Sequence, residues 1–540
     1  MTAEIWDVVI VGAGLSGLSA AHFLKKRDDK LKILVLEGKE RVGGRTVSSQ
    51  IPAANGGVDL WDFGGQWVTS SQPHVMELIK ELGLEVYPQF NTGTKVLHVG
   101  GPASKVRMYR TSIPAMSPLV LLDLTQLMWK IDRLSGTVCV HDPLKTPNAV
   151  GLDSMTLQSY IEQHAWTAEL KEQLGVCSRS VFGMEPSQMS FLFFLMYAAA
   201  AGGVMALLAS TPGCAQEFKI KGGTQQLSEC LAERVGWKNV RLGSAVTAIW
   251  QDAEWARVTT NSDTFLCRAV IVTCPPHLAA KISYQPPLPT MRECLSQNMP
   301  VGHMIKFIIT YQTAFWKEKG FSGEIVAGSS SNSPFCITYD ATSPRGNPAL
   351  VGFIAGQQAS RWSPEEAGER REAVISSLVK YLGPEAASFI HYEEKDWAKE
   401  DYSGGCPVNV MAPGMLTYYH PSLRKPCGRI HWAGTETATQ WCGYMSGAIQ
   451  AGQRAALEVL AEVCHVVLTT EEQEALQQGQ IVRSPPSKTM CLFTRKSVVM
   501  ATLTMSAVLL LAQRPHVLIK IKTFLTNTFS ASKHSILQNM

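Results

Sequence analysis

The first 37 residues contain the feature that most restricts the fold of this chain. A β-branched apolar run, 8–11, leads into a G-x-G-x-x-G motif, and a helix-compatible segment, 15–26, follows. A second apolar run, 33–36, ends in Glu37. Strand, glycine turn, helix, strand and acid at this spacing predict a dinucleotide-binding βαβ unit.

Each residue type in this motif has a separate chemical purpose. Gly12 permits the tight turn, Gly14 lets the backbone approach a pyrophosphate, and Gly17 lets the helix pack on the strand. The helix N-terminus offers free N–H groups to the phosphates, and Glu37 can accept hydrogen bonds from a ribose diol. On its own, this stretch is compatible with NAD, NADP or FAD.

Two further glycine pairs follow within thirty residues. RVGGRT contains Gly43 and Gly44, and DFGGQWV contains Gly64 and Gly65, with Gln66 next. Paired glycines after strands indicate backbone that passes close to a ligand, so we expect a large cofactor along this region. Arg45 is expected either to bind a phosphate or to form a surface ion pair.

Composition narrows the class of protein. The chain has 540 residues, of which 45% are hydrophobic and 17% charged, which is typical of a globular protein with two or three domains. Its 13 cysteines lack CxxC spacing, which favours reduced thiols, and no secretory signal precedes the first strand. Eight of the basic residues follow Glu474 without any acid, so the rest of the chain is net acidic and nucleic-acid binding is not expected.

Strand-like and helix-like segments alternate in some parts of the chain and not in others. It predicts a discontinuous cofactor domain of residues 1–90, 215–300 and 395–464, and a second domain of residues 91–214 and 301–394. Such an arrangement predicts a ligand site in the cleft between the domains.

The C-terminal residues differ in composition from the rest. A polar linker, 465–496, precedes an uncharged apolar run, 497–513, and a basic tail, 514–540. At about 1.5 Å per residue the apolar run spans roughly 25 Å, slightly less than a hydrocarbon core. Its basic flanks and late position predict a C-terminal membrane anchor in the mitochondrial outer membrane, with the globular part facing the cytosol.

Nine motifs together give the chain a specific resemblance. They are VGAGLSGL, RVGGRT, DFGGQWV, KIKGGTQQLSE, VIVTCPP, MPVGHMIKF, DYSGGC, WAGTETAT and GYMSGAIQAG. Over nearly its whole length the chain resembles the flavin-containing amine oxidase family, and within it the monoamine oxidases. The resemblance implies an α/β fold with a Rossmann-like FAD domain, a mixed-sheet substrate domain and a C-terminal membrane-anchor helix.

The resemblance also assigns roles to individual residues. It implies that FAD is held covalently by a thioether from Cys406 in SGGC. Lys306 matches a lysine that reaches the reactive flavin nitrogen through water, Tyr444 matches one of two rings that sandwich the substrate amine, and Trp397 matches a nearby tryptophan. The implied cofactor-binding set is Gly12, Gly14, Gly17, Glu37, Arg45, Gly65, Gln66, Val246, Cys406, Gly434, Thr435, Glu436 and Met445.

Two departures from the family pattern concern the substrate. Pro407 stands where the second aromatic ring is expected, with Tyr402 as a candidate replacement. The segment 198–203, AAAAGG, replaces polar or bulkier residues on the entrance side. Neither departure affects the residues expected to bind FAD.

The implied reaction is the oxidative deamination of an amine by FAD and dioxygen, with an aldehyde and hydrogen peroxide as products. A polyamine or amino acid oxidase is an alternative, and so is a weakly active, membrane-tethered flavin-binding protein, which the proline at 407 keeps open. The sequence shows neither a metal-ligand constellation nor a Ser/His/Asp set, and a homodimer is expected only by analogy.

Overall fold

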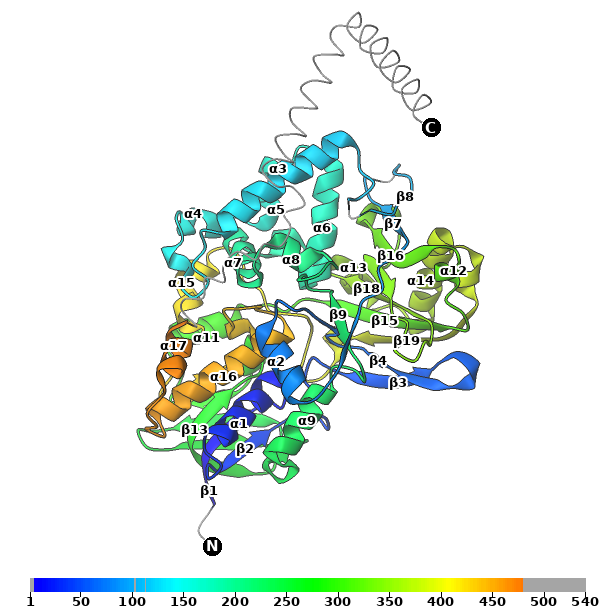
Figure 1. The fold of residues 1–540 in the computed structure, drawn as a ribbon. Helices are drawn as coiled ribbons and strands as arrows, with labels where there is room; N and C mark the ends of the chain where they lie inside the picture. Colours follow the sequence, from blue (N-terminus) through cyan, green and yellow to red (C-terminus); the bar gives the residue numbers. More distant parts are fainter. Residues whose placement is uncertain (1–3, 102, 112, 479–540) are drawn as a thin grey trace, which may run out of the picture. The chain divides into compact units, whose positions relative to one another are not determined.

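The computed structural model describes residues 4–101, 103–111 and 113–478, which all lie within one compact unit. Two large sheets organise these residues (Figure 1). The predicted anchor, 497–513, lies outside them. Within the described ranges, the structure contains no helix that is both long and apolar enough to cross a membrane.

The first sheet has eight strands and is built around the N-terminal strand β1. Its order is β10 (Val240–Arg241), β2 (Ile33–Leu36), β1 (Ile5–Val11), β13 (Thr264–Val272), β12 (Ala256–Thr260), β11 (Val246–Gln251) and β14 (Ser283–Gln285), with β20 (Ile430–Trp432) also paired to β13. Strands β10, β2, β1, β13 and β20 are parallel, as expected for a dinucleotide-binding fold.

Both faces of this sheet are covered, which explains the continuous apolar runs in its sequence. Val8 and Ile10 of β1 join one core cluster, and Val9 and Val11 join another. Helix α1 (Leu15–Arg27) packs against α16 (Met445–Glu462) and α9 (Gln226–Val235) on the first of these faces. The predicted strand–helix–strand unit is therefore present, with the helix one residue longer than expected.

The second sheet has seven strands. Its order is β19 (Phe389–Asp396), β15 (Met304–Tyr311), β18 (Ala349–Ala355), β17 (Ile337–Asp340), β16 (Phe321–Ala327), β7 (Thr94–His98) and β8 (Arg107–Tyr109). Helix α14 (Ala367–Leu382) packs on the face that carries Ile305, Phe307 and Ile309. Met304 and Ile308 lie on the opposite face, in a separate core cluster.

A group of helices lies beside that opposite face (Figure 1). It comprises α3 (Pro118–Ser135), α4 (Ala149–Asp153), α5 (Leu157–His164), α6 (Ala168–Phe182), α7 (Phe191–Ala201) and α8 (Val204–Leu208). Helix α7 begins at Phe191 because Ser190 caps it, and its residues are buried almost all round, so it is a core helix.

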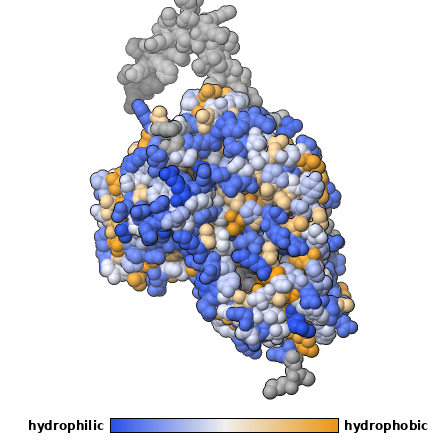
Figure 2. All heavy atoms as spheres, turned by 180° about the vertical axis from the view of Figure 1, so that it is seen from behind, coloured by the Kyte–Doolittle hydropathy of each residue, from blue (hydrophilic) through white to orange (hydrophobic). Residues whose placement is uncertain are grey.

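Smaller elements connect these layers. They are the strand pair β3 (Ser48–Pro52) and β4 (Val58–Asp62), the three-stranded sheet β5 (Trp67–Val68), β9 (Phe218–Ile220) and β6 (Val86–Pro88), and the helices α2 (Pro73–Glu81), α10 (Pro276–Ala279), α11 (Thr290–Gln297), α12 (Phe315–Glu318), α13 (Gln357–Trp362), α15 (Met415–Tyr419) and α17 (Thr470–Gln478). Helix α17 lies within the predicted linker and packs on α16. On the face shown in Figure 2, hydrophobic residues are interspersed among hydrophilic ones.

Candidate active site

The glycine turn after β1 is a main-chain cradle that admits no side chain at Gly12 or Gly17. Gly12 has φ +106°, and a Cβ on it would lie 2.7 Å from Thr273 Oγ1. A Cβ on Gly17 would lie 2.0 Å from the carbonyl oxygen of Gly12. Gly14 precedes α1 without a side-chain cap, so the first N–H groups of the helix are available to an anion.

The predicted ribose-binding acid lies beside this turn. The Glu37 carboxylate is buried at the end of β2 and accepts hydrogen bonds from the backbone N–H groups of Ala13 (2.7 Å) and Lys39 (3.0 Å). Gly43 N donates to the carbonyl oxygen of Ala13, so the second glycine pair meets the first. Val246 begins β11, two residues after Ser244, whose N–H donates to the Glu37 carbonyl oxygen. The structure therefore brings these sequence-distant predicted residues together.

Arg45 links this end of the site to the segment around residue 407. Its guanidinium donates to both carboxylate oxygens of Glu436, at 2.6 and 3.1 Å, and to the carbonyl oxygen of Pro407 at 2.7 Å. Burial alone would raise the pKa of Glu436, but the Arg45 charge holds it below its ordinary value. The predicted alternative of a surface ion pair is wrong, because the Glu436 side chain is only 1% exposed.

Lys306 is a buried amine in the middle of β15. It shares the face of Met304 and Ile308, and its Nζ donates to Gly64 O (2.9 Å) and to Gln66 Oε1 (2.6 Å). At 2% exposure it is not a lysine that extends to solvent at a sheet edge. Burial lowers its pKa to about 7, against the opposing charge of Asp62.

Cys406 lies in a tightly packed loop. Its N–H donates to Gly302 O at 2.9 Å, and its side chain is buried. Burial raises the pKa of the thiol to about 12, and the charges of Arg45 and Lys306 oppose that rise. Trp397, in the short turn after β19, is also buried and donates from Nε1 to Phe63 O at 2.9 Å, directly before the Gly64–Gly65 pair.

The segment 434–445 brings the C-terminal part of the chain to the glycine turn. Gly434 N donates to Ser16 Oγ at 2.9 Å, and Thr435 Oγ1 donates to Tyr444 O at 2.9 Å. Met445 begins α16, whose N-terminus has no side-chain cap. Two uncapped helix N-termini, α1 and α16, therefore belong to this region, and each favours negative charge in a ligand.

The ring of Tyr444 packs against two other aromatic rings. Its ring centroid is 5.0 Å from that of Trp441, in a T-shaped contact at 83°, and 6.1 Å from that of Tyr197. Gly443 allows the second approach, since a Cβ there would lie 2.3 Å from the Tyr197 hydroxyl oxygen. The sequence identified Tyr444 but not the two rings that pack on it. Tyr197 lies in an apolar helix whose sequence gives no sign of a role in the site. Trp441, by contrast, lies close to the GYMSGA motif.

Tyr402 does not supply the missing second ring. A Cβ on Gly38 would meet its ring at 3.0 Å, and the side chain is 53% exposed, so it lies near the end of β2. The rings that pack on Tyr444 are those of Trp441 and Tyr197. The suggested replacement of the ring at 407 by Tyr402 is therefore wrong, because the local turn directs Tyr402 elsewhere.

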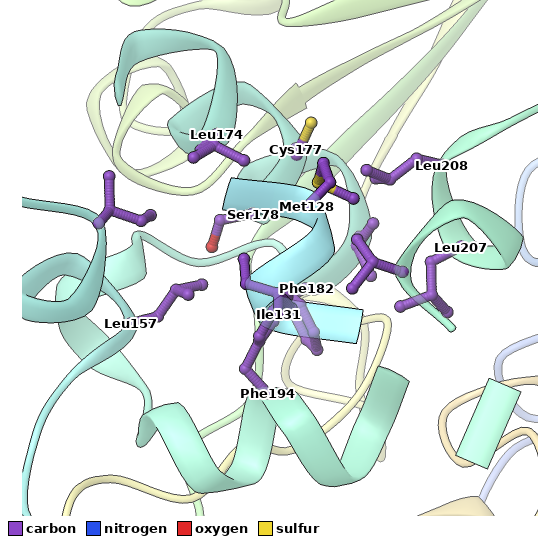
Figure 3. Close-up of a pocket in the computed structure, with 13 residues that line it drawn as sticks. Met128, Ile131, Leu157, Leu174, Cys177, Ser178, Phe182, Phe194, Leu207 and Leu208 are labelled. Atoms are coloured by element: carbon purple, nitrogen blue, oxygen red, sulfur yellow. The ribbon is translucent and has the colours of Figure 1, made fainter. Parts of the chain in front are cut away.

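A small cavity lies within the helical group and is separate from this site. Figure 3 shows it among α3, α6, α7 and α8, lined almost entirely by apolar side chains such as Met128, Leu174 and Phe194. It contains none of the predicted site residues, so we assign it no role in the chemistry.

The side-chain amides of Gln66 and Gln72 contain buried polar atoms without partners, and these atoms test whether a flavin nucleotide fits. Gln66 Nε2 and both amide atoms of Gln72 are buried without a hydrogen bond among the described residues. An unpaired buried amide is costly, so such atoms indicate a polar ligand. Together with the glycine cradle, the two uncapped helices and Glu37, they fit FAD.

A family model described as flavin containing amine oxidoreductase matches residues 15–460. Amine oxidase [flavin-containing] A of Bos taurus is 39% identical over 461 residues, which is 85% of each chain. The chain belongs to the flavin-containing amine oxidase family. The probable flavin-containing monoamine oxidase A of Dictyostelium discoideum is 38% identical over 85% of this chain and 98% of its own.

Solved structures of family members share the fold. Cyclohexylamine oxidase from Brevibacterium oxydans IH-35A superposes with a TM-score of 0.79 at 31% identity, over 85% of this chain and 99% of that one. Wild-type putrescine oxidase bound to putrescine gives a TM-score of 0.80 at 30% identity, over 85% and 100%. The predicted mixed α/β fold of the FAD-dependent amine oxidases is thus confirmed.

Proposed function

We propose that this member of the flavin-containing amine oxidase family oxidises a small-molecule amine with FAD and dioxygen. The amine becomes an imine that hydrolyses to an aldehyde, and dioxygen becomes hydrogen peroxide. FAD, when bound, supplies the two-electron chemistry. The observation that most supports the proposal is the buried amine of Lys306, hydrogen-bonded to Gly64 and Gln66 in a site that otherwise fits FAD.

The residues of the glycine cradle would bind and orient the nucleotide. Gly12, Gly14 and Gly17 with the N-terminus of α1 would hold the pyrophosphate, and Glu37 the ribose. Val246, Gly65, Gln66, Gly434, Thr435 and Met445 would border the rest of the cofactor. Arg45 and Glu436 would keep the two ends of the site in register through their buried ion pair.

Three residues would act near the reacting atoms. Tyr444 would form an aromatic wall for the amine, and Trp397 would close the site beside Gly64. The apolar surroundings would disfavour the ammonium form of the substrate, which must lose its proton before oxidation. Lys306 would exchange a proton with an ordered water, because its pKa near 7 makes both of its forms accessible.

The attachment of FAD to Cys406 is part of the proposal. The thiol is buried in the SGGC loop and lies within the electrostatic influence of both Arg45 and Lys306. Acid precipitation tests it: flavin colour should remain in the pellet for the wild-type protein and move to the supernatant for Cys406→Ala. Colour in the wild-type supernatant would contradict a covalent bond.

Anaerobic titration tests the oxidase activity itself. The detergent-solubilised protein should lose its flavin absorbance when an amine substrate is added and regain it when air is admitted. A panel of arylalkylamines, diamines and amino acids separates a monoamine oxidase from the polyamine and amino acid alternatives. Unchanged absorbance with every amine would leave only a flavin-binding role.

The membrane anchor is likewise proposed from the sequence, since 497–513 lies outside the described residues. Its apolar run and basic flanks support a tail anchor in the mitochondrial outer membrane, with the globular part in the cytosol. The full chain should resist alkaline carbonate extraction from mitochondria, and a chain ending at residue 482 should be released. Release of the full chain would contradict the anchor; light scattering of the truncated chain would test the homodimer.

The discontinuous domain arrangement is also retained as a proposal. The eight-stranded sheet draws on residues from 5 to 36, 240 to 285 and 430 to 432, and the seven-stranded sheet on residues from 94 to 109 and 304 to 396. This distribution supports a cofactor domain of 1–90, 215–300 and 395–464 and a substrate domain of 91–214 and 301–394. Limited proteolysis of the apo and FAD-loaded protein would test those boundaries.

A further inference from the structure

Glu400 is a carboxylate held by three cations from two distant parts of the chain. Lys39 Nζ lies 2.6 Å from its Oε1, Arg41 NH2 lies 2.8 Å from the same oxygen, and Lys395 Nζ pairs with Oε2. These hydrogen bonds hold the pKa of Glu400 at about 2 against the effect of its partial burial. Glu400 is therefore ionised at any pH at which the protein would be studied.

The residues that pair with Glu400 place this cluster between two parts of the proposed FAD site. Lys39 and Arg41 lie two and four residues after Glu37, the proposed ribose ligand, whereas Glu400 begins the loop that leads to Cys406. Lys39 Nζ also donates to Ser403 Oγ at 3.1 Å. The cluster thus joins the ribose end of the proposed FAD site to the loop that carries the proposed attachment point.

Glu400 also shapes the loop through its backbone. Its carbonyl oxygen accepts hydrogen bonds from the N–H groups of Ser403 (3.2 Å) and Gly404 (3.0 Å). On the far side of the loop, His277 Nε2 lies 2.8 Å from Ser403 O. Both side-chain and main-chain hydrogen bonds therefore hold residues 400–404 in place. This segment ends two residues before Cys406.

The ring of Trp397 lies next to the same cations. Lys39 Nζ and Lys395 Nζ lie 5.9 and 5.4 Å from its ring centroid. Without Glu400, the cations of Lys39, Arg41 and Lys395 would lose the carboxylate that they share, and two of them lie beside this buried ring. The loop would then lose the contacts that hold it against Lys39 and Arg41.

We propose that Glu400 is a positioning residue for covalent flavin attachment: it fixes the 400–406 loop to the ribose end of the site, so that the thiol of Cys406 meets the 8-methyl carbon of the isoalloxazine. The inference rests on the proposed FAD site. In the reaction, the S–H bond of the thiol and one C–H bond of the methyl group break and an S–C bond forms. The two electrons and two protons released pass to dioxygen by way of the flavin, which yields hydrogen peroxide.

The test compares Glu400→Gln with Glu81→Gln in the full, detergent-solubilised chain. Glu81 is a matched control, because it too is paired with three basic side chains, those of His22, Lys26 and Arg234, and it lies at the end of α2. FAD is added to protein produced under riboflavin limitation, and covalent flavin is followed by fluorescence of denatured protein on a gel. Total bound flavin and the unfolding temperature are measured on the same samples.

We expect the rate of covalent attachment per bound flavin to fall about tenfold or more in Glu400→Gln, since misplacement by about 1 Å has large effects on reaction rates. Glu81→Gln should retain the wild-type rate, and Glu400→Asp should recover part of it. Ser403→Ala, which removes one hydrogen bond from the cluster, should give a smaller loss in a folded protein and provides the test if Glu400→Gln does not fold.

Three results would overturn the inference. One is an unchanged rate per bound flavin in both Glu400→Gln and Ser403→Ala. Another is an equal loss in Glu81→Gln, which would reveal a general effect of lost stability. A wild-type protein without any covalent flavin would overturn the proposed attachment to Cys406 as well, which distinguishes that failure from the failure of Glu400 alone.

Discussion

The two ends of the candidate cofactor site are built in different ways. The phosphate and ribose end comes mainly from one stretch, 7–46, and consists largely of main chain and absent side chains. The proposed flavin-ring end would be assembled from segments near 64, 306, 397, 406 and 434–445, and would depend on buried charges and rings. A local motif can therefore specify the first end, whereas the second exists only after the chain has folded.

The two ends of the site also differ in the substitutions that they tolerate. In the cradle the constraint is steric, because a Cβ at Gly17 would overlap a carbonyl oxygen. At the ring end it is electrostatic, because Glu436 and Lys306 are buried, Arg45 is partly buried, and all three depend on one another or on nearby polar groups. Substitutions at the two ends should therefore fail for different reasons, and four experiments would test that expectation.

The largest effect is expected from Gly17→Val. The new Cβ would lie 2.0 Å from Gly12 O, where only backbone could move, so α1 would separate from the turn. We expect destabilisation above about 4 kcal/mol and no bound FAD. Flavin absorbance per protein and thermal unfolding measure both. Gly368→Ala in α14 is the control, since a Cβ there meets nothing within 4 Å; a Gly17→Val protein that binds FAD normally would contradict the steric account.

The second largest effect is expected from Glu436→Gln. It leaves the Arg45 guanidinium buried beside a neutral amide, and breaking such a pair costs about 3–5 kcal/mol. Urea unfolding measures the loss, and Glu393→Gln, on the exposed part of β19, should change stability little. The double variant Arg45→Met/Glu436→Gln should recover part of the loss. A further decrease in the double variant would show that Arg45 has other essential contacts.

Lys306→Met should slow reoxidation of the reduced flavin by dioxygen about 10²–10³-fold, because it removes the cation that would stabilise the negative charge developing on dioxygen as it accepts electrons. The pKa of Lys306 is about 7, far below the ordinary value of 10.5. The charged form therefore disappears as pH rises through 7, and the wild-type rate should fall over that range. Stopped-flow absorbance from pH 5.5 to 9 measures this.

The pH profile of Lys306→Met should be flat, whereas Lys219→Met should move the wild-type midpoint upward. Lys219 is a second buried amine, and its charge contributes to the lowered pKa of Lys306. A midpoint that remains in Lys306→Met would assign the titration to another group.

The smallest effect is expected from Pro407→Tyr. A second ring opposite Tyr444 should raise kcat/KM for arylalkylamines about 3- to 10-fold, in line with the roughly 0.5–1.5 kcal/mol of an aromatic pair. Steady-state assays of peroxide formation measure it. Tyr402→Ala should leave kcat/KM unchanged, since that ring lies against Gly38. A loss of activity in Tyr402→Ala would contradict the placement of that side chain.

Much of the fold followed from local pattern. The runs 8–11 and 33–36 are strands in the structure, and the glycine motif opens a helix as expected. Pattern did not reveal the pairing of Arg45 with Glu436, the rings around Tyr444 or the cluster at Glu400, because each includes residues that lie far apart along the chain. Tyr402 was misassigned because proximity to Cys406 in sequence says nothing of where a turn directs a side chain.

Residue types at short, fixed spacings specify the βαβ unit and the residues of the glycine cradle, and nine motifs along the chain together specify the family. Tertiary structure decided which of these residues meet. It buried Lys306 against Gly64 and Gln66, which brings its pKa near 7, and it directed Arg45 to Glu436. Those properties arise from desolvation and long-range contacts, which no local spacing encodes.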